Sequence, residues 1–203
     1  MIRNIVFDMG MVLMEFHPLK ACRAVAPDEA AAQELLAAIF TCPEWPRTDL
    51  GTISMEELGT LAMASLTDPA LRALVPGIIA GMPHNVVTPI PGMAAVVADL
   101  AARGFRLYLL SNAGMVFSDH RELVPGIETF SGVIFSALEG LVKPDPAIYT
   151  RLTERFELAP EECVFIDDVA KNIQTARELG WQGYVFDGDV AAIRRYFDAL
   201  PNP

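Results

Sequence analysis

The sequence predicts an α/β fold, in which a doubly wound parallel sheet carries an inserted all-helical segment. Short apolar runs alternate with helical patterns along most of the chain, and such alternation is typical of a parallel sheet with right-handed crossovers. Residues 15–88 break the alternation, because they are rich in Ala, Leu and Met and contain no convincing strand. We therefore expect a core domain made of residues 1–14 and 89–203, with residues 15–88 forming a helical cap.

The strands are predicted by five apolar runs, each followed directly by a polar residue. The runs are Ile2–Phe7, Arg106–Leu110, Gly132–Phe135, Cys163–Ile166 and Gly183–Phe186. Open α/β sheets bind their ligands outside the carboxyl ends of the strands. The polar residues that follow these runs are therefore the first candidates for a functional site.

Helices are predicted between the later strands. Pro91–Arg103 has a Pro-Gly start and an Ala-rich body, and Gly104 stands just past its end, as expected of a helix that stops at a glycine. Pro146–Phe156 and Ala170–Leu179 show similar patterns. Residues 87–91, which contain two prolines, are typical of a linker between the helical insertion and the remaining sheet.

The composition indicates a folded protein with a large core. Of its 203 residues, 52% are hydrophobic and 20% are charged, which excludes a disordered acidic chain. The formal net charge of −11 repels nucleic acid and anionic membranes. The same charge repels a phosphate ester, so a phosphate site would have to be locally positive.

Other global features suggest a cytoplasmic protein that acts on a small molecule. The chain has only three cysteines, without paired spacing, which favours a reducing compartment. No apolar run reaches the roughly 18–20 residues needed to cross a membrane. We expect a small-molecule partner, neither nucleic acid nor membrane, and either a monomer or a homodimer.

The polar residues expected at the carboxyl edge of the sheet form a chemically coherent set. A carboxylate can attack phosphorus, a hydroxyl can hold phosphoryl oxygens, a lysine can neutralise charge, and a carboxylate pair can bind Mg²⁺. Phosphoryl transfer depends mainly on such positioning and charge neutralisation. The set comprises Asp8, Ser111, Asn112, Lys143, Asp167 and Asp168.

Four ordered motifs in this set resemble those of the haloacid dehalogenase superfamily of hydrolases, and they cover nearly the whole chain. The motifs are Phe7-Asp8-Met9-Gly10, Leu109-Leu110-Ser111-Asn112, Val142-Lys143-Pro144 and Phe165-Ile166-Asp167-Asp168-Val169-Ala170-Lys171-Asn172. The helical insertion resembles the C1 type of cap in this superfamily. Gly10, the Asp-Asp-x-x-x-Asn pattern and residues 45–53 are similar to the subgroup that contains the bacterial α-D-glucose-1-phosphate phosphatase.

The resemblance implies a catalytic and substrate-binding role for four residues. Asp8 would be the nucleophile and would form an aspartyl-phosphate. Lys143 would pair with Asp8 and with the phosphate. Ser111 would bind the phosphate through its hydroxyl, and Asn112 through its backbone and side chain.

The resemblance also implies a Mg²⁺ site. Asp8 and Asp168 would bind the metal directly, Asp167 would hold a metal-bound water, and the backbone carbonyl of Gly10 would be a further ligand. Two adjacent carboxylates repel each other, and a divalent cation relieves that repulsion. Asn172 would either touch the ligand or cap or brace the metal loop.

Gly10 is the departure from the family pattern, because phosphatases of this type usually carry an aspartate there. That aspartate protonates the leaving oxygen, and general acid catalysis is typically worth ~10²–10⁴ in rate. A phosphatase without it would favour sugar 1-phosphates or other esters with acidic leaving groups. Glu15 or His17, just beyond the first strand, would be the nearest replacements. Trp45 and the Met residues of the insertion are expected in its core, while some of them could face the site and shape specificity.

Two other functions remain open at this point. A phosphate-binding or regulatory protein with little turnover would explain Gly10. A haloacid dehalogenase would use Asp8 without a metal, but Asp167 and Asp168 would then lack a cation to offset their repulsion.

Overall fold

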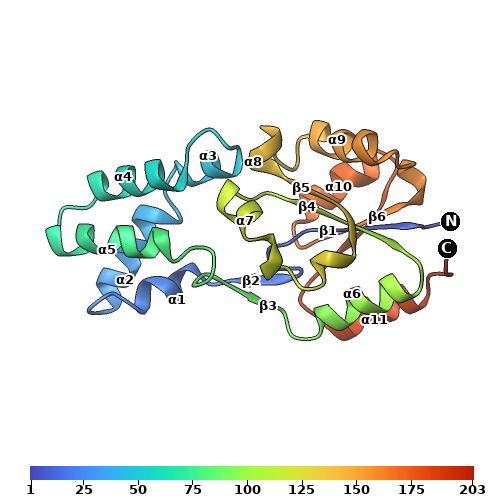
Figure 1. The fold of residues 1–203 in the computed structure, drawn as a ribbon, viewed down its shortest axis with the longest axis horizontal. Coiled ribbons are helices and arrows are strands. Elements are labelled where there is room, and N and C mark those ends of the chain that lie inside the picture. The colour runs from blue at the N-terminus through green and yellow to red at the C-terminus, as the bar shows by residue number, and fades with distance from the viewer.

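A sheet of five parallel strands lies at one end of the molecule in the computed structural model, which describes residues 1–203 (Figure 1). Its order is β5-β4-β1-β6-β7, and every neighbouring pair is parallel. The strands are β1 (Asn4–Phe7), β4 (Arg106–Ser111), β5 (Phe130–Phe135), β6 (Cys163–Asp167) and β7 (Gln182–Val185). The predicted fold class and all five predicted strands are confirmed.

Helices cover both faces of this sheet (Figure 1). Ile5 and Phe7 of β1 belong to one hydrophobic cluster, which includes a first pair of core helices. Val6 points to the opposite face and belongs to a second cluster, which includes a second pair. This alternation follows from the two-residue period of a strand. The first pair is α6 (Met93–Ala102) and α11 (Val190–Asp198), and the second is α9 (Pro146–Phe156) and α10 (Ala170–Glu178).

Three of these four helices match the predicted ranges closely, and α11 is an addition. The side chain of Asp189 caps α11 by accepting a hydrogen bond from the backbone N–H of Ala192 at 2.9 Å. The remaining core helices are the short α7 (Met115–Asp119) and α8 (Ser136–Glu139), with 3₁₀ turns at residues 121–123, 127–129 and 160–162.

Most helices of the insertion lie together at the other end of the molecule, while α3 lies next to α8 of the core (Figure 1). Local sequence starts several of them: Asp28 and Asp68 are N-caps, and Ser54 forms a capping box with Glu57. The helices are α1 (Pro18–Arg23), α2 (Glu29–Ile39), α3 (Trp45–Asp49), α4 (Met55–Ser65) and α5 (Pro69–Ala80).

The ends of the insertion correct one expectation. The sequence suggests no strand in residues 15–88 and a linker at 87–91, but β2 (Met14–Phe16) and β3 (Val87–Pro89) pair as an antiparallel ribbon. The chain leaves and re-enters the core at neighbouring points, so the two connecting segments lie side by side and satisfy each other's backbone groups. Three-residue strands carry too little pattern to be recognised in the sequence.

Strand order brings the candidate residues together. β1 lies between β4 and β6, and Phe7 is in register with Leu109 and with Ile166. Asp8, Ser111 and Asp167 therefore emerge at the same edge of the sheet. None of the helices combines the length and the apolar character that crossing a bilayer requires.

Candidate active site

A buried lysine joins two carboxylates at the carboxyl edge of the sheet. Lys143 Nζ lies 2.9 Å from Asp8 Oδ1 and 2.7 Å from Asp167 Oδ2, and its side chain is only 1% exposed. Charge-assisted hydrogen bonds of this length are among the stronger polar contacts in proteins. Residues separated by more than a hundred positions thus form one charged cluster, as expected from the sequence.

Burial and charge act in opposite directions on these groups. Burial lowers the pKa of Lys143, but Asp8 and Asp167 outweigh that effect and raise it, so the ammonium stays protonated. Burial raises the pKa of Asp8 from 3.8 to about 6, against the lowering effect of Lys143 and with a further contribution from Asp167. The protein therefore holds a carboxylate, whose charged form is destabilised by burial, next to a fixed positive charge.

Asp167 is held by hydrogen bonds on both of its oxygens. Asn172 Nδ2 lies 3.0 Å from each oxygen, and the backbone N–H of Val169 donates to Oδ1 at 2.8 Å. The carbonyl of Asn172 in turn accepts a hydrogen bond from the hydroxyl of Tyr149 at 3.0 Å. Of the two roles that the sequence left open for Asn172, the geometry shows the bracing one.

The side chain of Asn112 binds the backbone of Lys143. Its Nδ2 donates to the carbonyl of Lys143 at 2.9 Å, and its Oδ1 accepts from the Lys143 backbone N–H at 2.7 Å. Both side-chain polar atoms thus contact the loop that carries Lys143. The side chain positions the lysine, and the second N–H of Nδ2 still allows the predicted contact with a phosphoryl group.

Ser111 has a hydroxyl that no protein group satisfies. The residue is 1% exposed, and Ser111 Oγ is one of two buried side-chain polar atoms without a hydrogen-bond partner. An unpaired buried hydroxyl costs on the order of 1–3 kcal/mol. Such an atom at the sheet edge fits a site whose ligand supplies the missing oxygen.

The donor set also fits a divalent cation. Oxygen atoms of Asp8, Asp167 and Asp168 lie within 4.8 Å of one another, and hard cations such as Mg²⁺ prefer oxygen ligands. Burial, and then the charge of Asp167, raises the pKa of the half-buried Asp168. Three carboxylates and the Lys143 ammonium leave a net charge of −2 when all are ionised, which Mg²⁺ would cancel.

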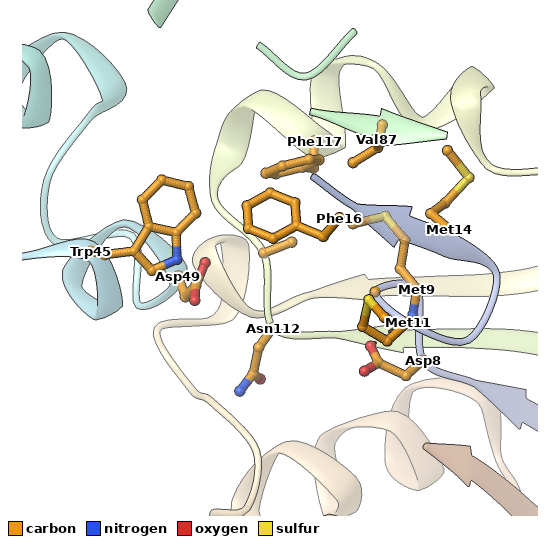
Figure 2. Close-up of a pocket in the computed structure, with 12 residues that line it drawn as sticks. Asp8, Met9, Met11, Met14, Phe16, Trp45, Asp49, Val87, Asn112 and Phe117 are labelled. Atoms are coloured by element: carbon orange, nitrogen blue, oxygen red, sulfur yellow. Dashed lines mark hydrogen bonds between the residues drawn. The ribbon is translucent and has the colours of Figure 1, made fainter. Parts of the chain in front are cut away.

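A pocket of about 220 Å³ opens above Asp8 (Figure 2). Eight of its 12 lining residues are hydrophobic. They come from the loop after β1, from β2 and β3, from α3 and from the segment that follows β4. The lining consists of Asp8, Met9, Gly10, Met11, Met14, Phe16, Trp45, Asp49, Val87, Asn112, Ala113 and Phe117.

Two residues of α3 line the pocket. Trp45 is half-buried and packs against the hydrophobic core, as expected, with its ring centroid 6.0 Å from that of Phe16, and it also faces the pocket. Asp49 lines the same pocket and carries no sequence signal that separates it from an ordinary helix-end residue. Only the fold of the insertion brings these side chains over the sheet.

Glu15 and His17 are absent from the pocket lining. Met14 and Phe16 of β2 face the pocket, and alternation along the strand turns Glu15 to the other side. Glu15 Oε2 instead lies 2.7 Å from His17 Nε2. The structure therefore offers neither residue as the missing acid.

Carboxylates gathered around a buried lysine at the carboxyl edge of a doubly wound sheet define a class of hydrolytic enzyme. The chain belongs to the haloacid dehalogenase-like hydrolase family, whose model matches residues 2–180. The superfamily suggested by the four motifs is thus confirmed.

Relatives with phosphatase names are consistent with action on phosphomonoesters. The chain is 24% identical over 179 residues to sesquiterpene phosphatase astK of Aspergillus oryzae, covering 88% of this chain and 86% of the relative. It is 30% identical over 111 residues to acyl-CoA dehydrogenase family member 10 of Mus musculus, but that match spans 55% of this chain and only 10% of the mouse protein.

The fold is shared with solved structures. One is a mutant of the HAD family enzyme bt-2542 from Bacteroides thetaiotaomicron in complex with magnesium and inorganic phosphate. It superposes with a TM-score of 0.72 at 20% identity, covering 96% of this chain and 100% of the other. At this identity the likeness supports the fold alone.

Proposed function

We propose that this chain is a Mg²⁺-dependent phosphatase that hydrolyses a small phosphomonoester through an aspartyl-phosphate on Asp8. The observation that carries the proposal is the position of Lys143 Nζ, held between Asp8 and Asp167 at the sheet edge where the Ser111 hydroxyl has no protein partner. Residues 1–14 and 89–203 would form the catalytic core, and residues 15–88 a C1-type cap. The three free cysteines are in keeping with a reducing, cytoplasmic location, and the proposal includes a monomer or a homodimer.

The side chains divide the work of the first step. Asp8 attacks phosphorus with one carboxylate oxygen, while the Lys143 ammonium neutralises charge on both nucleophile and phosphoryl group. Ser111 donates its hydroxyl to a phosphoryl oxygen. Asp167 and Asn112 keep Lys143 in place, since they hold its ammonium and its backbone, respectively.

The metal site would be formed by Asp8, Asp168, Asp167 and the backbone carbonyl of Gly10. When bound, Mg²⁺ would neutralise negative charge on the phosphoryl group and help to orient it. Asp167 already accepts hydrogen bonds from Lys143, Val169 and Asn172, so an indirect role through a water suits it better than a direct one. The carboxylate oxygens of Asp8, Asp167 and Asp168 support the choice of a hard cation.

The lining of the pocket favours an ester with a largely apolar organic group. The side chains beyond the phosphoryl position include Met14, Phe16, Trp45 and Phe117, which bury hydrocarbon or rings more readily than sugar hydroxyls. The name of the sesquiterpene phosphatase points in the same direction.

A sugar 1-phosphate is the second candidate, and Gly10 is the observation that favours it. Without a carboxylate at this position, an ester with an acidic leaving group needs less help from the enzyme. The motif resemblance to the glucose-1-phosphate phosphatase subgroup supports the same substrate. A phosphate-binding protein and a dehalogenase remain the alternatives outside this reaction class.

A phosphate-release assay tests the proposal. Purified protein is incubated with Mg²⁺ and a panel of apolar alkyl and aryl phosphates, sugar 1-phosphates and a haloacid. We expect phosphate release that stops with chelator and with Asp8→Asn. Release that persists in chelator would contradict the metal-dependent reaction, halide release would favour the dehalogenase, and an inactive wild type across the panel would favour the binding protein.

A further inference from the structure

The pocket contains open space at the place where Gly10 lacks a side chain. Gly10 lines the pocket, and a Cβ built on it would meet no heavy atom within 4 Å. No neighbouring group of the core has moved into this space. If the chain is the phosphatase proposed above, on which this inference rests, the leaving oxygen would face an opening that no core side chain occupies.

Asp49 of the cap lines the same pocket. Figure 2 shows its side chain across the pocket from Asp8, next to the indole of Trp45. Among the 12 lining residues, Asp8 and Asp49 are the only ones with ionisable side chains. Since Asp8 is assigned to the attack on phosphorus, Asp49 is the one remaining side chain of the pocket that can carry a proton to the substrate.

Contacts between cap and core hold α3 in this position. The Ser136 hydroxyl, at the end of β5, donates to the backbone carbonyl of Asp49 and accepts from the backbone N–H of Ala113 at 2.9 Å. A Cβ on Gly114 would lie only 3.4 Å from the carbonyl oxygen of Thr48. The last turn of α3 therefore packs closely against the segment that follows β4.

The charged surroundings of Asp49 suit a group that exchanges a proton near neutral pH. Burial, and then the negative charge of Asp8, raises its pKa from 3.8 to about 6. The backbone N–H of Gly114 and the more distant Lys143 act in the opposite direction. No other ionisable side chain lines the pocket, so these groups define its electrostatic environment.

We propose that Asp49 is the general acid and base of the reaction and replaces, from the cap, the carboxylate that Gly10 lacks. As Asp8 forms its bond to phosphorus, the bond from phosphorus to the leaving oxygen breaks, and the Asp49 carboxyl gives its proton to that oxygen. The Asp49 carboxylate then takes a proton from the water that attacks the aspartyl-phosphate. The bond between phosphorus and Asp8 breaks, which releases phosphate and restores both side chains.

This assignment changes what the enzyme requires of its substrate. A proton donor in the cap removes the need for an acidic leaving group, so an ordinary alkyl phosphate becomes a competent substrate. It also links chemistry to the closed arrangement of cap and core, because Asp49 reaches the site only when α3 lies against the loop after β4.

The test compares Asp49→Asn with wild type on esters whose leaving groups differ in acidity. The measured quantity is kcat/KM, which reports the steps up to departure of the leaving group. It is independent of the later hydrolysis of the aspartyl-phosphate on Asp8. For an alkyl phosphate we expect a loss of ~10²–10⁴. For p-nitrophenyl phosphate, whose leaving group needs no proton, the loss should be far smaller, so the dependence on leaving-group acidity becomes steeper in the variant.

Two further variants make the result specific. Glu44→Gln removes a carboxylate next to α3 that lines a different pocket, and it should leave both rates unchanged. Gly10→Asp added to Asp49→Asn should restore part of the alkyl phosphate rate, because a carboxylate returns to the open space. Circular dichroism and a melting curve check that the variants are folded.

Each outcome decides between the two proposals. Equal losses on both esters, or no loss on the alkyl ester, would overturn the role of Asp49 while leaving the phosphatase intact. A rise in KM for both esters with unchanged kcat would assign Asp49 to binding and also overturn it. Phosphate release by Asp8→Asn would instead overturn the proposed function.

Discussion

The buried carboxylate of Asp8 should destabilise the metal-free protein, and Asp8→Asn should recover that stability. Burial raises the pKa of Asp8 from 3.8 to about 6, a change that corresponds to about 3 kcal/mol. Because the folded-state pKa is the higher one, the favourable contribution is complete below about pH 4. It is lost as the pH rises from about 4 to about 6, and above this range the wild type carries the full cost.

Urea unfolding of both proteins between pH 4 and 8 in chelator measures this effect. The other titratable groups should contribute the same pH dependence to both proteins. The free energy of unfolding of Asp8→Asn should therefore increase relative to that of the wild type as the pH rises. By pH 7 the gain should approach about 3 kcal/mol.

Magnesium should reverse the difference in the free energy of unfolding between Asp8→Asn and the wild type. A ligand that binds only the folded state at a hundred times its Kd stabilises it by about 2.7 kcal/mol, and the wild type should bind Mg²⁺ more tightly than the variant. A variant that is less stable than the wild type at pH 7 without metal would refute the reasoning. It would mean that the 2.9 Å pair with Lys143 outweighs the cost of burying Asp8.

The other predictions concern single contacts of the site. Asn172→Ala removes two 3.0 Å hydrogen bonds to Asp167 and should lower the free energy of unfolding by about 1–3 kcal/mol together with kcat; unchanged urea midpoint and kcat would contradict the bracing role. Ser111→Ala should lower kcat/KM without loss of thermal stability, since its hydroxyl has no protein partner; a stability loss with unchanged kinetics would argue against phosphate binding. Trp45→Ala should raise KM more for an apolar aryl phosphate than for a sugar 1-phosphate, and the reverse order would disfavour the apolar substrate. Glu15→Gln, in contrast, should leave kcat/KM within about twofold of wild type, because Glu15 lies outside the pocket.

The sheet and its polar edge could be predicted from the sequence for a physical reason. A buried parallel strand is a short apolar run, and a polar residue directly after it marks the edge where parallel strands end together. Asp8, Ser111 and Asp167 follow this rule, so their convergence needed only the correct strand order. The bond of Lys143 to Asp8 followed from the motif resemblance.

The contribution of the cap could not be predicted in this way. Trp45 and Asp49 reach the pocket through the packing of α3 against the segment after β4, which is a long-range contact without a local pattern. The pairing of β2 with β3 is likewise set by where the insertion leaves and re-enters the core. For Asn112, the motif indicated proximity to the site, but only the structure shows that its side chain is used to hold Lys143.

Trapping of the phosphorylated enzyme during turnover tests whether Asp8 is the nucleophile. Borohydride reduces an aspartyl-phosphate to homoserine, and peptide mass spectrometry locates the modified position after reaction with Mg²⁺ and a hydrolysed phosphomonoester. We expect homoserine at position 8 in the wild type and in Asp49→Asn, and none without substrate. Phosphate release without modification at Asp8, or modification at another carboxylate, would contradict this role of Asp8.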